Sequence, residues 1–199
     1  MKQHLEQYLS QEAIVAVQPI LDQYHLVLKI KSPRKTRHGD YRKLPNGTNQ
    51  ITINASLNQY AFLLTLIHEI AHHVAYLKFG RHILPHGPEW KQSFVNVMHP
   101  FLKEPYFDAS LIPLLKRHFV NPKASSDTDG ALALALKRFD PPNDKNYIFE
   151  LTLGTLFRIP NGRVFKLGKQ RTKRFECVET ATGRTYLFSP NAEVELVEL

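Results

Sequence analysis

The chain has 199 residues, of which 43% are hydrophobic and 22% are charged, proportions that are ordinary for a folded globular protein and exclude a wholly disordered chain. Lys and Arg outnumber Asp and Glu by 26 to 18, and this excess favours anionic partners, chiefly nucleic acid. The one cysteine, Cys177, excludes an internal disulfide and a zinc ribbon built on paired cysteines.

The sequence has no feature typical of a secreted or membrane protein. Residues 1–17 lack the basic start and long apolar core of a signal peptide. The longest apolar stretch, residues 60–67, is interrupted by Thr65 and ends before His68, far short of the length needed to cross a bilayer. We therefore expect a cytoplasmic protein that has no membrane partner.

The N-terminal part of the chain predicts one helix and three strands. Residues 3–22 carry apolar side chains near a 3.6-residue period, which is typical of an amphipathic helix. The turn sequence Asn46-Gly47 favours a hairpin, because both residues tolerate the positive φ that tight turns require. The strands are expected in chain order at residues 26–30, 37–42 and 50–54.

Two further helices are predicted in the middle of the chain. Residues 57–79 are apolar on nearly every side, which indicates a buried central helix. Ser56, with Gln59 three residues later, has the spacing of a capping box, and Gly80 is a suitable C-terminal stop. Residues 88–101 predict the next helix, with a proline in its first turn.

The clearest domain boundary is residues 121–146, which are rich in Pro, Ser, Asp and Asn at both ends. The intervening ALALALKRF sequence favours a short helix, because Ala and Leu are strong helix formers, and either Asp127 or Asp129 could cap it. From residue 147 onward, short β-like runs alternate with Gly-containing turns. Residues 147–199 therefore predict a small antiparallel β module.

The strongest chemical signal is His68-Glu69-Ile70-Ala71-His72, an HExxH sequence on the predicted buried helix. Residues four apart on a helix lie on one face, so the two imidazoles can bind one zinc ion. Glu69 lies on an adjacent face, where its carboxylate can accept a proton from a metal-activated water molecule. Two histidines and a glutamate on an apolar helix would be costly without a compensating partner.

A third histidine follows this helix in a context that suits a zinc ligand. His86 stands directly before the expected start of the next helix, in the sequence HGPEW. A catalytic zinc needs three protein ligands and one open position, so we predict one zinc ion per chain on His68, His72 and His86. We interpret His73 and His82 as ordinary polar residues. Glu89 either supports the third ligand or serves as a favourable acid in a first helical turn.

The sequence HEIAHHVAYLKFGRHILPHGPEWKQSFVNVM resembles the core of the SprT-like (Spartan-type) metalloprotease family. The resemblance covers residues 1–120 and includes the RHGDYR sequence at residues 37–42. It implies a minimal zincin domain, with helices packed on a small antiparallel sheet, in which His68, His72 and His86 bind zinc and Glu69 is catalytic. What it implies about function is less uniform: eukaryotic relatives cleave proteins crosslinked to DNA, while many bacterial members are only predicted peptidases. Many bacterial relatives carry a C-terminal zinc ribbon with paired cysteines, whereas residues 147–199 contain only Cys177, so we expect a ribbon-like module without metal.

Two basic segments are candidates for contact with nucleic acid. Residues 31–43 carry six Lys or Arg residues against one Asp, and residues 157–175 carry seven with no acid and three interleaved phenylalanines. Cations beside exposed aromatic rings suit single-stranded nucleic acid, whose bases stack while its phosphates are neutralised. The alternative is a solvated sheet face above a phenylalanine core. The candidate DNA contacts are Lys166, Lys169, Arg171, Lys173 and Arg174.

The sequence therefore predicts an α+β zinc metalloprotease that hydrolyses protein or peptide substrates associated with DNA. Its expected parts are a protease domain at residues 1–120, a linker with a short helix at 121–146, and the β module at 147–199. The alternative is a nucleic-acid-binding or transcription-associated module whose zinc site is structural or barely active. Glu69 favours the enzyme, because a purely structural zinc site needs no general base.

Overall fold

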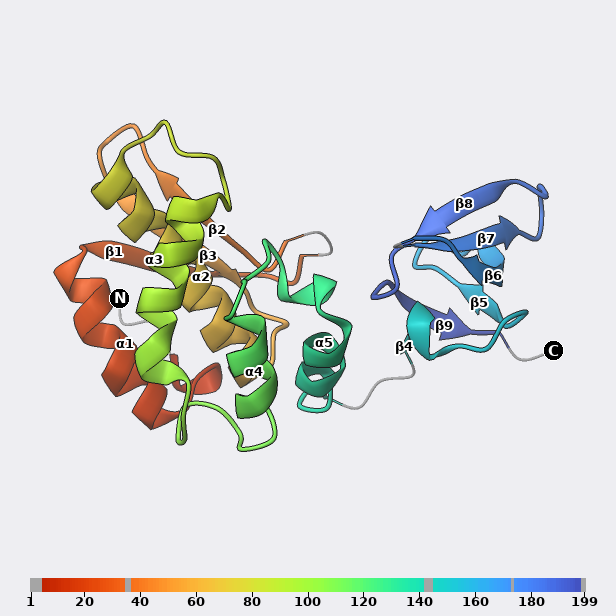
Figure 1. Ribbon diagram of the computed structural model, residues 1–199, viewed down its shortest axis with the longest axis horizontal. Helices are drawn as coiled ribbons and strands as arrows, with labels where there is room; N and C mark the ends of the chain where they lie inside the picture. Colours follow the sequence, from red (N-terminus) through yellow and green to blue (C-terminus); the bar gives the residue numbers. More distant parts are fainter. Residues whose placement is uncertain (1–4, 35–36, 142–144, 173, 198–199) are drawn as a thin grey trace. The chain divides into compact units, whose positions relative to one another are not determined.

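Two separate apolar cores divide the chain into two units, Met1–Asp140 and Pro141–Leu199. The computed structural model describes residues 5–34, 37–141, 145–172 and 174–197 (Figure 1). The first unit combines helices with a small sheet, and the second consists mainly of strands. The α+β class predicted from the sequence is therefore confirmed.

The helices of the first unit differ from the predicted ones mainly at their ends. The helix predicted at residues 3–22 begins only at Gln11, because the Ser10 side chain accepts a hydrogen bond from the Ala13 N–H and caps the helix there. Residues Leu5–Gln7 form a separate 3-10 turn before it. The α-helices are α1 Gln11–Gln23, α2 Gln59–Phe79, α3 Pro88–Met98, α4 Ile112–His118 and α5 Gly130–Lys137.

The long helix α2 forms the centre of the first unit, as its apolar sequence predicts. Its N-cap is Asn58 rather than Ser56, because the Asn58 side-chain oxygen accepts hydrogen bonds from the N–H groups of Tyr60 and Ala61. At its other end, Gly80 adopts a φ of 79° and stops the helix. The side chains of Phe62, Leu66, Ile67 and Ile70, among others, are fully buried.

The sheet of the first unit is mixed rather than purely antiparallel. Its strands β1 (Leu26–Lys31), β2 (Gly39–Lys43) and β3 (Asn49–Asn54) lie in the order β1-β3-β2. The strands β2 and β3 form the predicted antiparallel hairpin, with Gly47 at a φ of 82° in its turn. Because β2 occupies the far edge, β3 returns between the other two strands and runs parallel to β1. In the described part of the chain, β2 therefore has one edge without a partner strand.

The helix predicted in the linker at residues 121–146 packs into the core of the first unit. In α5, the side chains of Leu132, Ala135 and Leu136 are buried in that core, and Asp129 caps the helix by accepting a hydrogen bond from the Leu132 N–H. The Asn58 side-chain amide donates hydrogen bonds to the Leu136 carbonyl at 2.9 Å and to an Asp140 carboxylate oxygen at 2.6 Å. One residue thus caps α2 and holds α5 against it.

The second unit is a six-stranded antiparallel sheet with its own small core. Its core consists of Ile148, Phe157, Phe165, Leu167, Cys177 and Val194. The run predicted as a strand from residue 147 instead forms a short strand followed by a 3-10 turn at Ile148–Glu150. Its strands are β4 (Lys145–Tyr147), β5 (Leu156–Arg158), β6 (Val164–Gln170), β7 (Phe175–Glu179), β8 (Thr185–Phe188) and β9 (Glu193–Leu196). They lie in the order β4-β9-β5-β6-β7-β8.

The double role of Asn58 predicts a large effect on the stability of the first unit. Replacing Asn58 by Ala removes a helix cap and the hydrogen bonds to Leu136 in α5 and to Asp140 after it, so the free energy of unfolding should fall by about 1–3 kcal/mol. Asn58→Asp keeps the capping oxygen but brings a second carboxylate to Asp140, and it should be destabilising as well. Denaturant unfolding followed by the fluorescence of Trp90, the one tryptophan of the chain, measures this unit selectively. An Asn58→Asp variant that is as stable as the wild type would contradict the role of Asn58 in holding α5 against α2.

Candidate metal centre

Three histidine side chains converge at one point on the surface of α2. His68 and His72 project from one face of this helix, and His86 approaches from the loop before α3, where it adopts a φ of 59°. The Nε2 atoms are 3.1 Å apart between His68 and His72, 3.1 Å between His72 and His86, and 3.3 Å between His86 and His68. The sequence prediction that these three residues lie together agrees with the structure.

The spacing of these nitrogen atoms fits a tetrahedral metal site. Ligands placed tetrahedrally at 2.0–2.1 Å from a zinc ion are about 3.3–3.4 Å from one another. Among the residues that the structure describes, these three histidines form the one cluster of His, Cys, Asp or Glu side chains that could hold a metal ion. The donor set is therefore three imidazole nitrogens, which suits zinc and other first-row transition metals.

Burial favours the uncharged form of all three imidazoles, and their proximity adds to this effect for His68 and His72. Burial, together with the neighbouring His72 and His86, lowers the pKa of His68 to about 2. The same causes, burial first and then His86, lower the pKa of His72 to about 4, and burial lowers the pKa of His86. Neutral imidazoles can offer nitrogen lone pairs, and three lone pairs directed at one point repel each other unless a cation lies between them.

Trp90 packs against all three histidine rings. Its ring centroid lies 4.7 Å from that of His68, 5.2 Å from that of His72 and 4.6 Å from that of His86, and only 1% of the residue is exposed. Phe94, one turn later on α3, contacts the His68 ring at a centroid distance of 5.2 Å. Because α3 supplies these aromatic contacts, it fixes the orientation of the ligand rings.

Glu69 lies on the adjacent face of α2, against the strand β2. The residue is only 6% exposed, and a Cβ atom on Gly39 would come within 2.7 Å of its Oε1 atom. Burial raises the pKa of the Glu69 carboxyl to about 8, with a further contribution from Asp40, while a hydrogen bond from the Tyr41 backbone N–H and the charge of Arg34 oppose the increase. A buried carboxyl group beside three convergent imidazoles, with a pKa near neutrality, can take up and release a proton without being a metal ligand.

The sequence did not single out Gly39, Tyr41 or Trp90 as site residues. Gly39 and Tyr41 belong to a short strand whose contact with α2 has no local signal in the chain. Trp90 belongs to the HGPEW sequence, but that sequence does not show that its ring meets the ligands. His73, interpreted as an ordinary polar residue, is 1% exposed and its Nδ1 atom lies 2.9 Å from the Tyr41 hydroxyl. His82 is exposed in the loop between α2 and α3.

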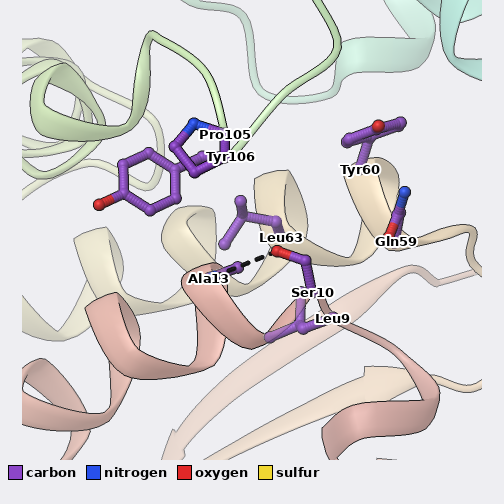
Figure 2. Close-up of a pocket in the computed structure, with 8 residues that line it drawn as sticks. All are labelled: Leu9, Ser10, Ala13, Gln59, Tyr60, Leu63, Pro105 and Tyr106. Atoms are coloured by element: carbon purple, nitrogen blue, oxygen red, sulfur yellow. Dashed lines mark hydrogen bonds between the residues drawn. The ribbon is translucent and has the colours of Figure 1, made fainter.

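A pocket at the N-terminal end of α2 is separate from this centre. It has a volume of about 60 Å³ and is lined by residues including Ser10, Tyr60, Leu63 and Tyr106 (Figure 2). That volume holds a few water molecules rather than a peptide side chain. The Ser10 oxygen in its wall already accepts the capping hydrogen bond from Ala13, and we assign the pocket no function.

The candidate DNA contacts in the second unit are exposed, but the neighbouring phenylalanines are not. Lys166, Lys169, Arg171 and Arg174 lie on the surface, whereas Lys173 falls outside the described residues. Arg171 forms an ion pair with Glu176. Phe157 and Phe165 are fully buried, and Phe175 packs against the same core. The phenylalanines expected as platforms for stacking bases are therefore core side chains, and of the features that predicted DNA contact only the exposed positive charge is present on this surface.

The contact between Trp90 and the ligands provides a direct test of metal binding. Adding Co²⁺ to metal-free protein should quench Trp90 fluorescence and saturate at one ion per chain, because the ion binds beside the indole ring. Zn²⁺ should displace it and restore the emission. His86→Ala should weaken binding by more than about a hundredfold, since even residues that only support a ligand contribute about 10–100-fold. His82→Ala, a change in the same loop, should bind as the wild type does, and equal binding by both variants would exclude His86 as a ligand.

Comparison with known proteins identifies the family. The structure has no helix, among the residues it describes, that is long and apolar enough to span a membrane. No curated protein and no solved structure matched the chain. Residues 4–109, more than half of the chain, match the SprT-like family. This match confirms the resemblance that was drawn from the HExxH helix and the HGPEW sequence: the chain belongs to the SprT-like family.

Proposed function

We propose that this protein is a zinc-dependent peptidase that hydrolyses peptide bonds, with one zinc ion per chain held by His68, His72 and His86. The observation that carries the proposal is the convergence of the three Nε2 atoms at 3.1–3.3 Å with Glu69 beside them on the next face of the helix. Membership of the SprT-like family supports a function of the metalloprotease type.

The residues of the chain have distinct roles in this reaction. A bound zinc ion would polarise the scissile carbonyl and lower the pKa of a water molecule. Glu69 accepts the proton of the attacking water and then delivers it to the leaving amine, which is general acid–base catalysis by one carboxyl group. Trp90 and Phe94 hold the ligand rings and keep water away from their inner side.

The size of the ligand cluster favours catalysis over a purely structural role. Structural zinc sites usually have four protein ligands, whereas catalytic sites have three and leave one position for water or substrate. In the described part of the chain, no fourth His, Cys, Asp or Glu joins the three histidines. Cys177, the residue that would most readily close such a site, is buried in the core of the second unit.

Glu69→Gln separates the enzyme from a binding module with a structural zinc. The variant should keep its zinc and its stability but lose at least about a hundredfold in kcat/KM on an unfolded protein substrate, because an amide cannot accept the proton. Zinc content by elemental analysis and peptide release measure the two effects. Glu12→Gln, the same chemical change at an exposed position on α1, serves as the control.

Equal cleavage by Glu69→Gln and wild type would exclude Glu69 as the general base. If the zinc-loaded wild type cleaves neither free nor DNA-bound proteins, the nucleic-acid-binding alternative replaces the peptidase.

We propose further that the substrates are proteins associated with DNA and that the second unit contacts the phosphate backbone. The support is electrostatic: the chain has a formal net charge of +8, and Lys166, Lys169 and Arg174 expose their side chains on or beside the strands β6 and β7. A contact made through charge alone is insensitive to base sequence and weakens steeply as salt rises.

Salt titration tests this interaction with DNA. Replacing Lys166, Lys169 and Arg174 by Ala should weaken DNA binding and reduce the slope of log K against log salt by roughly 0.9 for each phosphate that the protein no longer neutralises. The matched control removes the same charge from the first unit by replacing three exposed lysines with Ala, at Lys29, Lys31 and Lys103. A larger decrease in the control variant would place the DNA-binding surface on the protease unit.

A further inference from the structure

The catalytic helix and the edge strand β2 contact each other in a matched register. Glu69 and His73 are four residues apart on α2, and they lie over Gly39 and Tyr41, which are two residues apart on β2. Four residues of helix rise about 6 Å and two residues of strand about 6.6–6.8 Å, so the two spacings nearly coincide. Glu69 therefore lies against Gly39, and His73 lies against Tyr41.

At the first contact, the strand and the carboxyl group touch directly. A Cβ atom at Gly39 would lie 2.7 Å from Glu69 Oε1 and 2.7 Å from the Thr65 Cγ2 atom, distances too short for any side chain. Glycine is thus required for Glu69 to lie against the backbone of β2. Two residues later, the Tyr41 backbone N–H donates a hydrogen bond to the same carboxylate.

At the second contact, a chain of hydrogen bonds joins α2, β2 and β3; His73 is buried, and Tyr41 and Asn49 are half-buried. The Tyr41 hydroxyl donates to the Asn49 side-chain oxygen on β3 at 3.1 Å. It must therefore accept from the Nδ1–H of His73, 2.9 Å away on α2. The Tyr41 ring also meets the His73 ring at a centroid distance of 5.3 Å, and the Tyr24 ring meets it at 5.5 Å. Removing the Tyr41 hydroxyl would leave the Nδ1–H of the buried His73 without this partner, which costs free energy.

The position of β2 explains why such a connection matters. Among the strands that the structure describes, only β3 pairs with β2, because β2 lies at the edge of the sheet. The other edge of the strand carries the Tyr41 N–H that faces Glu69, so a small shift of the strand would change the hydrogen bond to the carboxylate. In the described structure, the His73–Tyr41 bond ties this edge strand to α2 one turn away from Glu69.

We propose that His73 is a positioning residue for Glu69: its hydrogen bond to Tyr41 holds β2 in register on α2, so that Gly39 and the Tyr41 N–H fix the orientation of the catalytic carboxylate. This inference rests on the proposed peptidase function. His73 touches neither the substrate nor the reacting atoms, and it acts through Tyr41 and the strand.

Removing single atoms from this connection tests the proposal in the full-length, zinc-loaded protein. Tyr41→Phe keeps the ring and the backbone N–H but deletes the hydroxyl. It should lower kcat about tenfold with little change in KM or zinc content, since a displacement of about 1 Å can cost about a hundredfold in rate. Tyr24→Phe removes a hydroxyl from the other tyrosine whose ring meets His73, and it should keep kcat within about twofold of the wild type.

Two substitutions of His73 distinguish positioning from simple packing. An Asn side chain places its amide donor where Nδ1 stands, whereas Gln places its donor nearer the Nε2 position. His73→Asn should therefore retain several times the kcat of His73→Gln, and Tyr41→Phe should have little further effect in the His73→Gln background. Equal kcat values for Tyr41→Phe and Tyr24→Phe would overturn the proposal, as would equal values for the two His73 variants.

The experiment also separates failure of this inference from failure of the proposed function. If the wild type shows no peptidase activity, the proposed function fails, and amide hydrogen exchange of Tyr41 becomes the measure. Faster exchange in Tyr41→Phe than in Tyr24→Phe would still support the connection between His73 and the strand. Equal exchange in the two variants would overturn it.

Discussion

The first unit depends on the burial of α2, a helix that carries ionisable side chains through an apolar core. Transferring such groups from water is costly unless each one finds a partner. The structure meets this requirement on two adjacent faces. His68 and His72 join His86 around a common point, and Glu69 and His73 are covered by β2. The residues that make the helix chemically useful are therefore the same residues that determine what must pack around it.

The metal ligands could be predicted because their signal is local. The i, i+4 spacing of His68 and His72 is a property of the helix itself, and His86 stands immediately before the next helix, so no knowledge of the sheet was needed. Gly39 and Tyr41 could not be found in this way. They are about 30 residues from their partners in the sequence, and a glycine in a short strand carries no sign of the carboxyl group it meets.

Several segments were predicted less accurately because their local sequence fits two different structures equally well. Ser56 and Asn58 are both good N-cap residues, and the helix begins after Asn58, whose side chain caps it and also bonds to Leu136 in α5 and to Asp140. The polar ends of residues 121–146 suggested a linker, yet the Ala and Leu residues between them have a buried face against the first core. Likewise, the phenylalanines of residues 157–175 fit either a stacking surface or a core, and the sheet buries them. The parallel pairing of β1 with β3 follows from the strand order, which the hydrophobic pattern alone does not specify.

The HExxHH sequence at residues 68–73 places the candidate metal ligands and the candidate acid–base group on adjacent faces of one helix. Each step along an α-helix turns the chain by about 100°, so the pair at positions 68 and 72 and the pair at positions 69 and 73 form two parallel rows offset by one residue. The first row, with Trp90 behind it, faces the loop from α2 to α3, and the second faces the edge strand. Because both rows belong to one rigid helix, the distance between the ligands and Glu69 is set by helical geometry. What remains free is the rotation of the Glu69 side chain, and β2 is the element positioned to restrict it.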